Sequence, residues 1–174
     1  MMVLGVDPGL DGALAWQRID GGAVVDYGAI DTPIKIHKNT KGRVQRAYDL
    51  PKMRDTLIDL VLDHGEEVRA VLEWIHAGVW SGEGRAQGAS TAYSMGYGVA
   101  VWEALFTAFY VPYELVTPVV WKRAMLTVGN YDKDATRLQA QKLWPRVGLS
   151  LVKHNGRGDA LFICKYGVRR VLSN

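Results

Sequence analysis

The sequence predicts an α/β fold in which a five-stranded mixed β-sheet, three antiparallel strands followed by two parallel ones, carries helices on both faces. Three observations lead to this prediction. Three apolar segments with short links open the chain, as in an antiparallel meander. Each of the two later strand segments follows a helical pattern, which is the connection that parallel strands need. The chain has 174 residues, so we expect a single domain over residues 1–174.

The strand segments are apolar runs that end at turn-forming residues. The first run ends in Asp7, which is followed by Pro8-Gly9, a pair typical of a turn. Gly21-Gly22 separates the second and third runs, where a two-residue hairpin turn favours glycine. The predicted strands are residues 2–7, 12–19, 23–30, 68–74 and 113–117.

The helical segments alternate with the last two strands and then fill the C-terminal third of the chain. Pro51 opens the first helix at a position where its missing N–H costs nothing, and Gly65 is expected to end it. Gly96 and Gly98 lie in the longest helix and would permit close packing against a partner helix. The other predicted helices are residues 92–110, 118–126, 133–144 and 158–172.

The composition excludes several classes of protein. Hydrophobic residues make up 48% of the chain and charged residues 22%, which is typical of a folded domain and not of a disordered one. The single cysteine, Cys164, excludes an internal disulfide and a cysteine-based zinc cluster, and its apolar neighbours predict a buried, inert thiol. No apolar run reaches the roughly 18 residues of a membrane span, and the N-terminus lacks the basic region of a signal peptide. We therefore expect a cytoplasmic protein with no membrane partner.

The charges are unevenly distributed along the chain. Residues 1–117 hold ten basic and fifteen acidic side chains, whereas residues 118–174 hold eleven basic and three acidic ones. A basic third indicates a polyanionic partner such as nucleic acid or, equally, a solvated basic helix face. A second basic run, residues 35–46, contains five Lys or Arg and no acid. We expect it to be a mobile loop whose Lys38, Lys41 and Arg43 contact DNA phosphates.

Three acids occupy positions where strands end or a helix starts. Asp7 and Glu73 end strands that would be adjacent and parallel, and Asp159 opens the last helix. Converging carboxylates repel one another unless cations lie between them, and hard oxygen ligands select Mg²⁺ or Mn²⁺. Two such ions can drive phosphodiester hydrolysis. Asp7 could instead be a turn former and Asp159 a helix N-cap, but a buried Glu73 without a partner is costly.

Several segments in order resemble the RuvC-type Holliday junction resolvases. Gly5-Val6-Asp7-Pro8-Gly9 is similar to the family's opening motif. The other matching segments are Val71-Leu72-Glu73, residues 88–98, residues 117–122, residues 129–133 and Gly158-Asp159-Ala160-Leu161. The resemblance extends along nearly the whole chain and implies a ribonuclease H-like fold.

The resemblance also implies an activity and a set of site residues. The activity is a metal-dependent endonuclease that resolves Holliday junctions or other branched DNA by paired symmetric nicks, in recombination, repair or DNA packaging. The enzyme would be a homodimer with two Mg²⁺ ions per active site, which Mn²⁺ can replace, and the long glycine-bearing helix would form the interface. Asp7, Glu73 and Asp159 match the metal-binding acids. Lys122 and Lys133 match basic residues near the scissile phosphate and the DNA backbone.

The chain departs from the family pattern at a fourth metal ligand and at an aromatic wedge. The family has Asp or His three residues before the last acid, where this chain has Gly156. His154 or Asn155 could supply the ligand after a small shift of the loop, and we favour His154. The wedge position is His76, with Trp74 nearby; either ring could stack on unpaired bases, and Trp74 could equally be a core residue.

Three other functions fit parts of the pattern. An ATPase of the same sheet type needs a second lobe, for which 174 residues leave no room. An RNA-processing nuclease of the same fold would share the carboxylates and differ in substrate. A non-catalytic nucleic-acid-binding module would fit the basic third and the missing fourth acid, but the presence of three acids argues against it.

Overall fold

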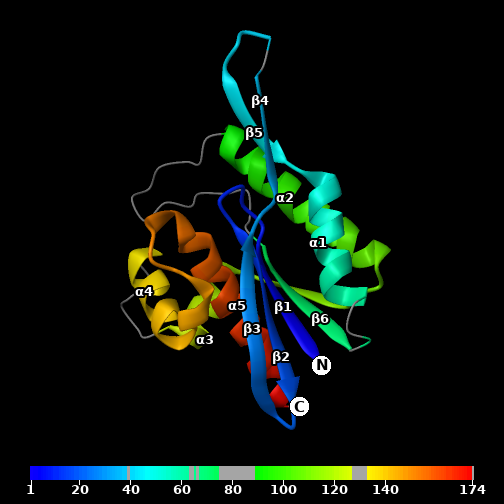
Figure 1. Cartoon of the computed structure of the whole chain (residues 1–174), viewed down its shortest axis with the longest axis vertical. Helices are drawn as coiled ribbons and strands as arrows, with labels where there is room; N and C mark the ends of the chain where they lie inside the picture. The colour runs from blue at the N-terminus through cyan, green and yellow to red at the C-terminus, as the bar shows by residue number, and fades with distance from the viewer. Residues whose placement is uncertain (39, 63–64, 66, 75–88, 127–132, 174) are drawn as a thin grey trace.

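A five-stranded mixed sheet lies at the centre of the computed structural model (Figure 1). The structure describes residues 1–174 except 39, 63–64, 66, 75–88, 127–132 and 174. The strands are β1 (Met2–Asp7), β2 (Ala13–Asp20), β3 (Ala23–Asp31), β6 (Val68–Glu73) and β7 (Tyr113–Val116), in the order β3-β2-β1-β6-β7. β1 pairs antiparallel with β2 and parallel with β6, and β6 is parallel to β7. The predicted sheet is confirmed.

The hairpin turn between β2 and β3 follows from its two glycines. Asp20 pairs with Ala23, so the loop has two residues, Gly21 and Gly22. Their φ angles are +55° and +81°. Such a turn needs positive φ at both positions, which glycine adopts without steric cost. The antiparallel edge of the sheet is therefore specified locally.

Helices cover both faces of the sheet, as predicted. The helices are α1 (Leu50–Leu62), α2 (Ala89–Ala108), α3 (Pro118–Met125), α4 (Lys133–Leu143) and α5 (Asn155–Leu172), with short 3₁₀ helices at Pro145–Val147 and Val152–His154. One core joins α3, α4 and α5 to the sheet, with Trp121 and Phe162 fully buried. The other joins α1 and α2 to the opposite face through Met53, Trp102 and Phe106 (Figure 1).

Helix α5 approaches β1 closely because a glycine faces it. A Cβ atom on Gly5 would clash with the backbone nitrogen of Cys164 and lie 2.5 Å from the carbonyl oxygen of Ala160. The Cys164 thiol is fully buried and donates a hydrogen bond to the Val3 carbonyl (3.1 Å), and burial raises its pKa. The prediction of a buried thiol is confirmed. The close crossing also fixes where the N-terminal turns of α5, with Asp159, lie relative to the end of β1.

The basic run at residues 35–46 is not the mobile loop that we predicted. It forms most of a two-stranded antiparallel arm, β4 (Ile34–Lys38) and β5 (Val44–Tyr48), which projects beyond the central sheet (Figure 1). The run of charges hides an alternation in β4, where Ile34 and Ile36 alternate with Lys35 and His37, and Val44 adds a β-branched residue to β5. Gly42, at φ +73°, supplies the left-handed turn.

Gly98 in α2 permits a close approach, but to a turn and not to a helix. A Cβ atom on Gly98 would clash with the carbonyl oxygen of Pro8 and lie 2.5 Å from the Tyr48 hydroxyl. Gly96 faces open space. In the described part of the chain, no helix combines the length and the apolar character of a membrane span.

Candidate active site

The three predicted acids come together at one edge of the sheet. Val6 of β1 pairs with Leu72 of β6, so Asp7 and Glu73 follow at the ends of adjacent parallel strands. Asp159 lies in the second turn of α5, which begins at Asn155. The alternative that Asp159 is only a helix N-cap is therefore wrong. The charges of Asp7 and Asp159 both act on Glu73, which places the three carboxyl groups in one electrostatic cluster.

Glu73 is a buried acid whose pKa is strongly shifted. Its side chain is 6% exposed. Burial, followed by the negative charge of Asp7, raises its pKa from the ordinary 4.5 to about 8. The Trp121 indole N–H donates to Oε1 of Glu73 at 2.7 Å, and this bond and the charge of Lys122 oppose the rise. Without a cation, Glu73 is therefore mostly protonated at pH 7.

Asp7 is held by the turn that follows β1. Its Oδ1 accepts a hydrogen bond from the Gly9 backbone N–H at 3.1 Å. The carbonyl oxygen of Pro8, the residue between them, accepts from the Tyr48 hydroxyl at 2.9 Å, and that hydroxyl lies 3.0 Å from the carbonyl oxygen of Ser94. Asp7 thus shapes its turn and also faces the other two acids. Tyr48 ties the turn to the base of the β4–β5 arm and to α2.

The acids open into a large cleft of about 1070 Å³. Asp7 and Asp159 lie at its floor with the turn from Gly9 to Gly12. The arm forms one wall and the N-terminal half of α2 another. Asp7 and Asp159 are therefore accessible from the cleft.

The donor set fits Mg²⁺ by its chemistry. Carboxylate oxygens are the ligands that this ion prefers, and a cation would offset the repulsion that raises the pKa of Glu73. Over the described residues, no three His, Cys, Asp or Glu side chains form a preassembled metal cluster. Asp7, Glu73 and Asp159 are the residues that would hold the ion.

Position 156, where the family has its fourth metal ligand, leaves no room for a side chain. A Cβ atom on Gly156 would clash with the Asp11 carbonyl oxygen and lie 2.7 Å from the Gly12 Cα. The His154 side chain is buried, and its Nδ1 accepts a hydrogen bond from the Leu151 N–H at 3.4 Å. Burial, followed by the charge of Arg157, lowers the pKa of His154.

Asn155 and His154 face different surroundings. Asn155 lines the cleft, whereas His154 does not. The Oδ1 atom of Asn155 accepts a hydrogen bond from Nε of Arg137 at 3.1 Å. The assignment of His154 as a metal ligand stays a prediction, and the cleft geometry ranks Asn155 ahead of it.

The remaining predicted residues lie in different surroundings. Lys122 is half-buried beside Glu73, with its Nζ 5.3 Å from the centre of a Trp121 ring. Trp74 is half-buried and packs against the core of α1 and α2, which favours the core interpretation. His76 and the side chain of Lys133 lie outside the described residues.

The last of the predicted residues are the basic ones on the arm. Lys38, Lys41 and Arg43 are exposed there. Arg46, farther down the arm, pairs with Asp11 at 2.8 Å and donates to the Leu10 carbonyl at 2.9 Å. The outer part of the arm therefore presents positive charge. Its base is bound through Arg46 to the turn that follows β1.

Sequence reasoning missed the residues that orient the acids. Trp121 contacts Glu73 across 48 positions of the chain, and Tyr48 reaches Pro8 across 40. No local sequence pattern predicts either contact. The only signal for Trp121 is its place one turn after Pro118, in a helix expected to start beside the end of a strand.

We expect Glu73→Gln to stabilise the metal-free protein in a pH-dependent way. With a pKa of about 8 when folded and 4.5 when unfolded, wild-type Glu73 keeps a proton that the unfolded chain has lost. Stability therefore falls as pH rises from about 4.5 to about 8. The variant lacks this loss, so its free energy of unfolding should exceed that of the wild type only slightly at pH 5. At pH 9 the difference should reach about 2 kcal/mol or more, which corresponds to roughly 4–8 °C in Tm.

The measurement is thermal unfolding at pH 5, 7 and 9 with chelator and with Mg²⁺. Mg²⁺ should raise the Tm of the wild type more than that of Glu73→Gln. An Asp55→Asn variant, on the exposed face of α1, serves as the control. An advantage of Glu73→Gln that is equal at all three pH values would contradict the assigned pKa.

The fold defined by these elements is ribonuclease H-like, as the sequence resemblance implied. No protein-family profile matches the chain, and no curated protein matches it in sequence. Solved structures do match it, over nearly its whole length.

The matching structures include RuvC. The Thermus thermophilus RuvC structure aligns with a TM-score of 0.62 and 15% identity, over 99% of this chain and 97% of that one. T. thermophilus RuvC in complex with a Holliday junction substrate aligns with a TM-score of 0.56 and 14% identity, over 99% and 94%. The resemblance to RuvC-type resolvases is thereby confirmed at the level of the fold.

Proposed function

We propose that this protein is a metal-dependent endonuclease that cleaves branched DNA, with the Holliday junction as its main substrate. The observation that carries the proposal is the cluster of Asp7, Glu73 and Asp159 in a RuvC-like fold, with Asp7 and Asp159 lining a cleft and Glu73 buried behind them. A cleft of about 1070 Å³ next to Asp7 and Asp159 supports entry of a DNA strand at this place. The basic arm beside it matches a polyanion in charge.

The side chains have separate tasks in this proposal. Asp7, Glu73 and Asp159 bind two Mg²⁺ or Mn²⁺ ions, which when bound activate a water molecule and neutralise charge on the phosphate. The Trp121 N–H fixes the direction of the Glu73 carboxylate, and the Gly9 N–H that of Asp7. Lys122 adds positive charge beside Glu73, where a phosphate oxygen would gain negative charge.

The proposal includes a homodimer that acts on DNA inside the cell. Two symmetric active sites would allow paired nicks in the two matching strands of a junction. The exposed part of α2 that does not line the cleft, with Gly96 and Ala100, would form the interface. Resolution of junctions in recombination, repair or DNA packaging is the process that such a reaction serves.

One observation favours a second candidate, a non-catalytic binding module. The described acids are not preassembled to hold a metal. Incubating the protein with labelled four-way junction, linear duplex, single strand and RNA–DNA hybrid, with and without Mg²⁺, separates the candidates. Symmetric Mg²⁺-dependent nicks in the junction support the resolvase. Binding without cleavage supports the module, and preferred cleavage of RNA supports an RNA-processing nuclease.

We expect neutralising the outer part of the arm to weaken junction binding and its salt dependence. Lys38→Gln, Lys41→Gln and Arg43→Gln together remove three exposed cations. The log–log slope of affinity against salt should fall by about one unit for each phosphate contact that is lost. The measurement is the dissociation constant for a four-way junction at several salt concentrations, using a cleavage-deficient background.

The matched control removes three cations elsewhere on the surface. Lys52 and Arg54 on α1 and Lys142 on α4 are exposed and away from the cleft. The control triple should leave the slope nearly unchanged. Equal slopes for the arm triple and the wild type would show that the arm stays away from DNA.

A further inference from the structure

Two exposed tyrosines form a nearly parallel pair on the α2 wall of the cleft. Tyr93 is 73% exposed and Tyr97 is 40% exposed. They are four residues apart on one helix face, with ring centres 6.2 Å apart and planes inclined by 22°. Both line the cleft that holds Asp7 and Asp159. The proposed chemistry at the acids uses neither ring.

A third tyrosine extends this series toward the acids. The ring centre of Tyr48 lies 5.7 Å from that of Tyr97. The Tyr48 hydroxyl contacts the carbonyl oxygen of Pro8, the residue directly after Asp7. The three rings therefore lead from the solvent-exposed wall of the cleft to the turn that carries a catalytic acid.

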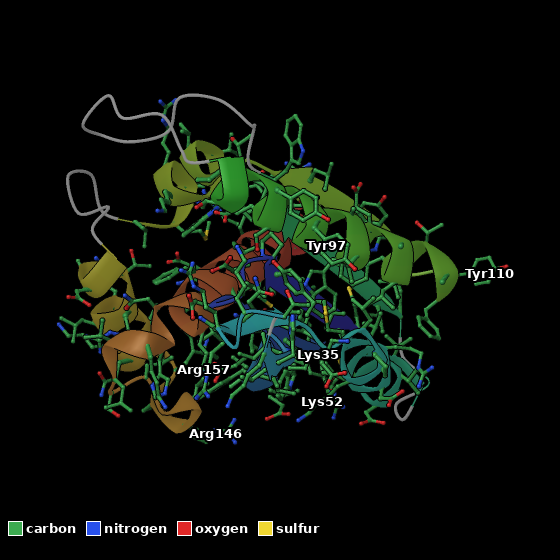
Figure 2. The ribbon with its side chains drawn as sticks, turned by 90° about the horizontal axis from the view of Figure 1, so that it is seen from above. Lys35, Lys52, Tyr97, Tyr110, Arg146 and Arg157 are labelled. Atoms are coloured by element: carbon green, nitrogen blue, oxygen red, sulfur yellow. The ribbon has the colours of Figure 1, made fainter. Side chains whose placement is uncertain are left out.

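The opposite walls of the same cleft carry positive charge. Lys35 comes from β4 and Lys153 from the 3₁₀ helix before α5. In Figure 2, Tyr97 and Lys35 project from the facing elements α2 and β4, while Tyr110 lies at the far end of α2. The same cleft thus presents exposed aromatic rings, cations and the carboxylates of Asp7 and Asp159.

This combination matches an unpaired nucleotide better than a protein surface. Bases stack on exposed aromatic rings without regard to sequence, while cations hold the backbone phosphates. A protein partner would bury the two rings against apolar side chains, but the other walls of the cleft carry charged residues, including Lys35, Arg46 and Lys153.

We infer that Tyr93 and Tyr97 form a stacking platform that holds an unpaired base of the DNA strand whose phosphate enters the carboxylate cleft. The inference rests on the proposed function and adds how the strand is held. The platform would capture a base that is unstacked at the branch point and so place the neighbouring phosphate at Asp7, Glu73 and Asp159. Tyr93 and Tyr97 are positioning residues in this scheme.

The test measures binding to single-stranded DNA in the full-length protein carrying Asp7→Asn. Replacing both Tyr93 and Tyr97 by Ala should weaken binding of a short single-stranded oligonucleotide by about 10- to 100-fold, since each stacked base contributes that order of affinity. Phe at both positions should stay within about threefold of the parent, because the ring is kept. Affinity for linear duplex should not change.

A second readout reports stacking directly. A fluorescent 2-aminopurine placed at the branch point of a four-way junction should be quenched by the parent protein and by the Phe variant, and not by the Ala variant. Tyr110→Ala is the matched control, because Tyr110 is 93% exposed and lies outside the cleft. It should leave binding and quenching unchanged.

The outcomes separate this inference from the proposed function. Equal binding by the Ala and Phe variants, or an equal loss for duplex and single strand, would overturn the platform. So would a change from dimer to monomer in sedimentation of the Ala variant, because the rings would then belong to a protein interface. If the wild type cuts no DNA but the Ala variant alone loses single-strand binding, the platform stands and the nuclease proposal fails.

Discussion

Replacing Asp7 or Asp159 by Asn, or Glu73 by Gln, is expected to lower Mg²⁺-dependent junction cleavage by about 10³-fold or more. Each change removes one negative charge from the group that would bind the metal, and metal activation is worth several kcal/mol in the transition state. The amides keep the local hydrogen bonds. In Asp7→Asn the new amide oxygen can still accept from the Gly9 N–H, and in Glu73→Gln it can accept from the Trp121 N–H. The loss would therefore report charge and not local structure.

Junction binding should persist in all three variants, because Lys and Arg contacts to phosphate carry most of it. The measurements are the single-turnover cleavage rate and the dissociation constant for the same labelled junction. Asp11→Asn is the matched control, since Asp11 lines the same cleft but its side chain is 83% exposed and pairs with Arg46. Its cleavage rate should stay within a few-fold of the wild type. A near-normal rate for any of the three variants would remove that acid from the site.

The sheet and the placement of the acids could be predicted because their signals are local. Apolar runs predict β1 and β6, and helix α1 directly before β6 brings that strand back into the sheet parallel to β1. Parallel strands end at the same edge of a sheet, so Asp7 and Glu73 had to lie near each other. Gly21-Gly22 specified the hairpin by itself.

The arm and the orienting contacts could not be predicted, for different physical reasons. In the arm, dense positive charge masked the alternation of Ile34 and Ile36 in β4, and charge runs are usually solvated loops. The Trp121–Glu73 and Tyr48–Pro8 contacts join distant parts of the chain. Such contacts depend on how the helices pack, which no local pattern encodes. The same packing determines that Gly98 faces a turn instead of a partner helix.

The fold also decides whether the missing family acid could be restored at Gly156. Gly156→Asp is expected to inactivate the protein, not to complete its site. Any Cβ there meets the backbone of Asp11 and Gly12, and backbone cannot yield as a flexible side chain can, so we expect a loss of stability of about 3 kcal/mol. Gly156→Ala should show most of this loss. Gly96→Ala, the same change where nothing lies within 4 Å, should be neutral or stabilise α2 by up to about 1 kcal/mol.

With position 156 closed, a fourth ligand must come from its neighbours, and the variants Asn155→Ala, Asn155→Asp and His154→Ala identify which one. Asn155 lines the cleft, so Asn155→Ala should lower cleavage at least about tenfold, and Asn155→Asp should keep Mg²⁺-dependent activity by retaining an oxygen ligand. His154→Ala should mainly lower the Tm, since it removes a buried ring that accepts from Leu151. If His154→Ala lost cleavage at an unchanged Tm while Asn155→Ala stayed active, His154 and not Asn155 would be the fourth ligand. Full activity of both Ala variants would mean that water takes the fourth place beside three protein carboxylates.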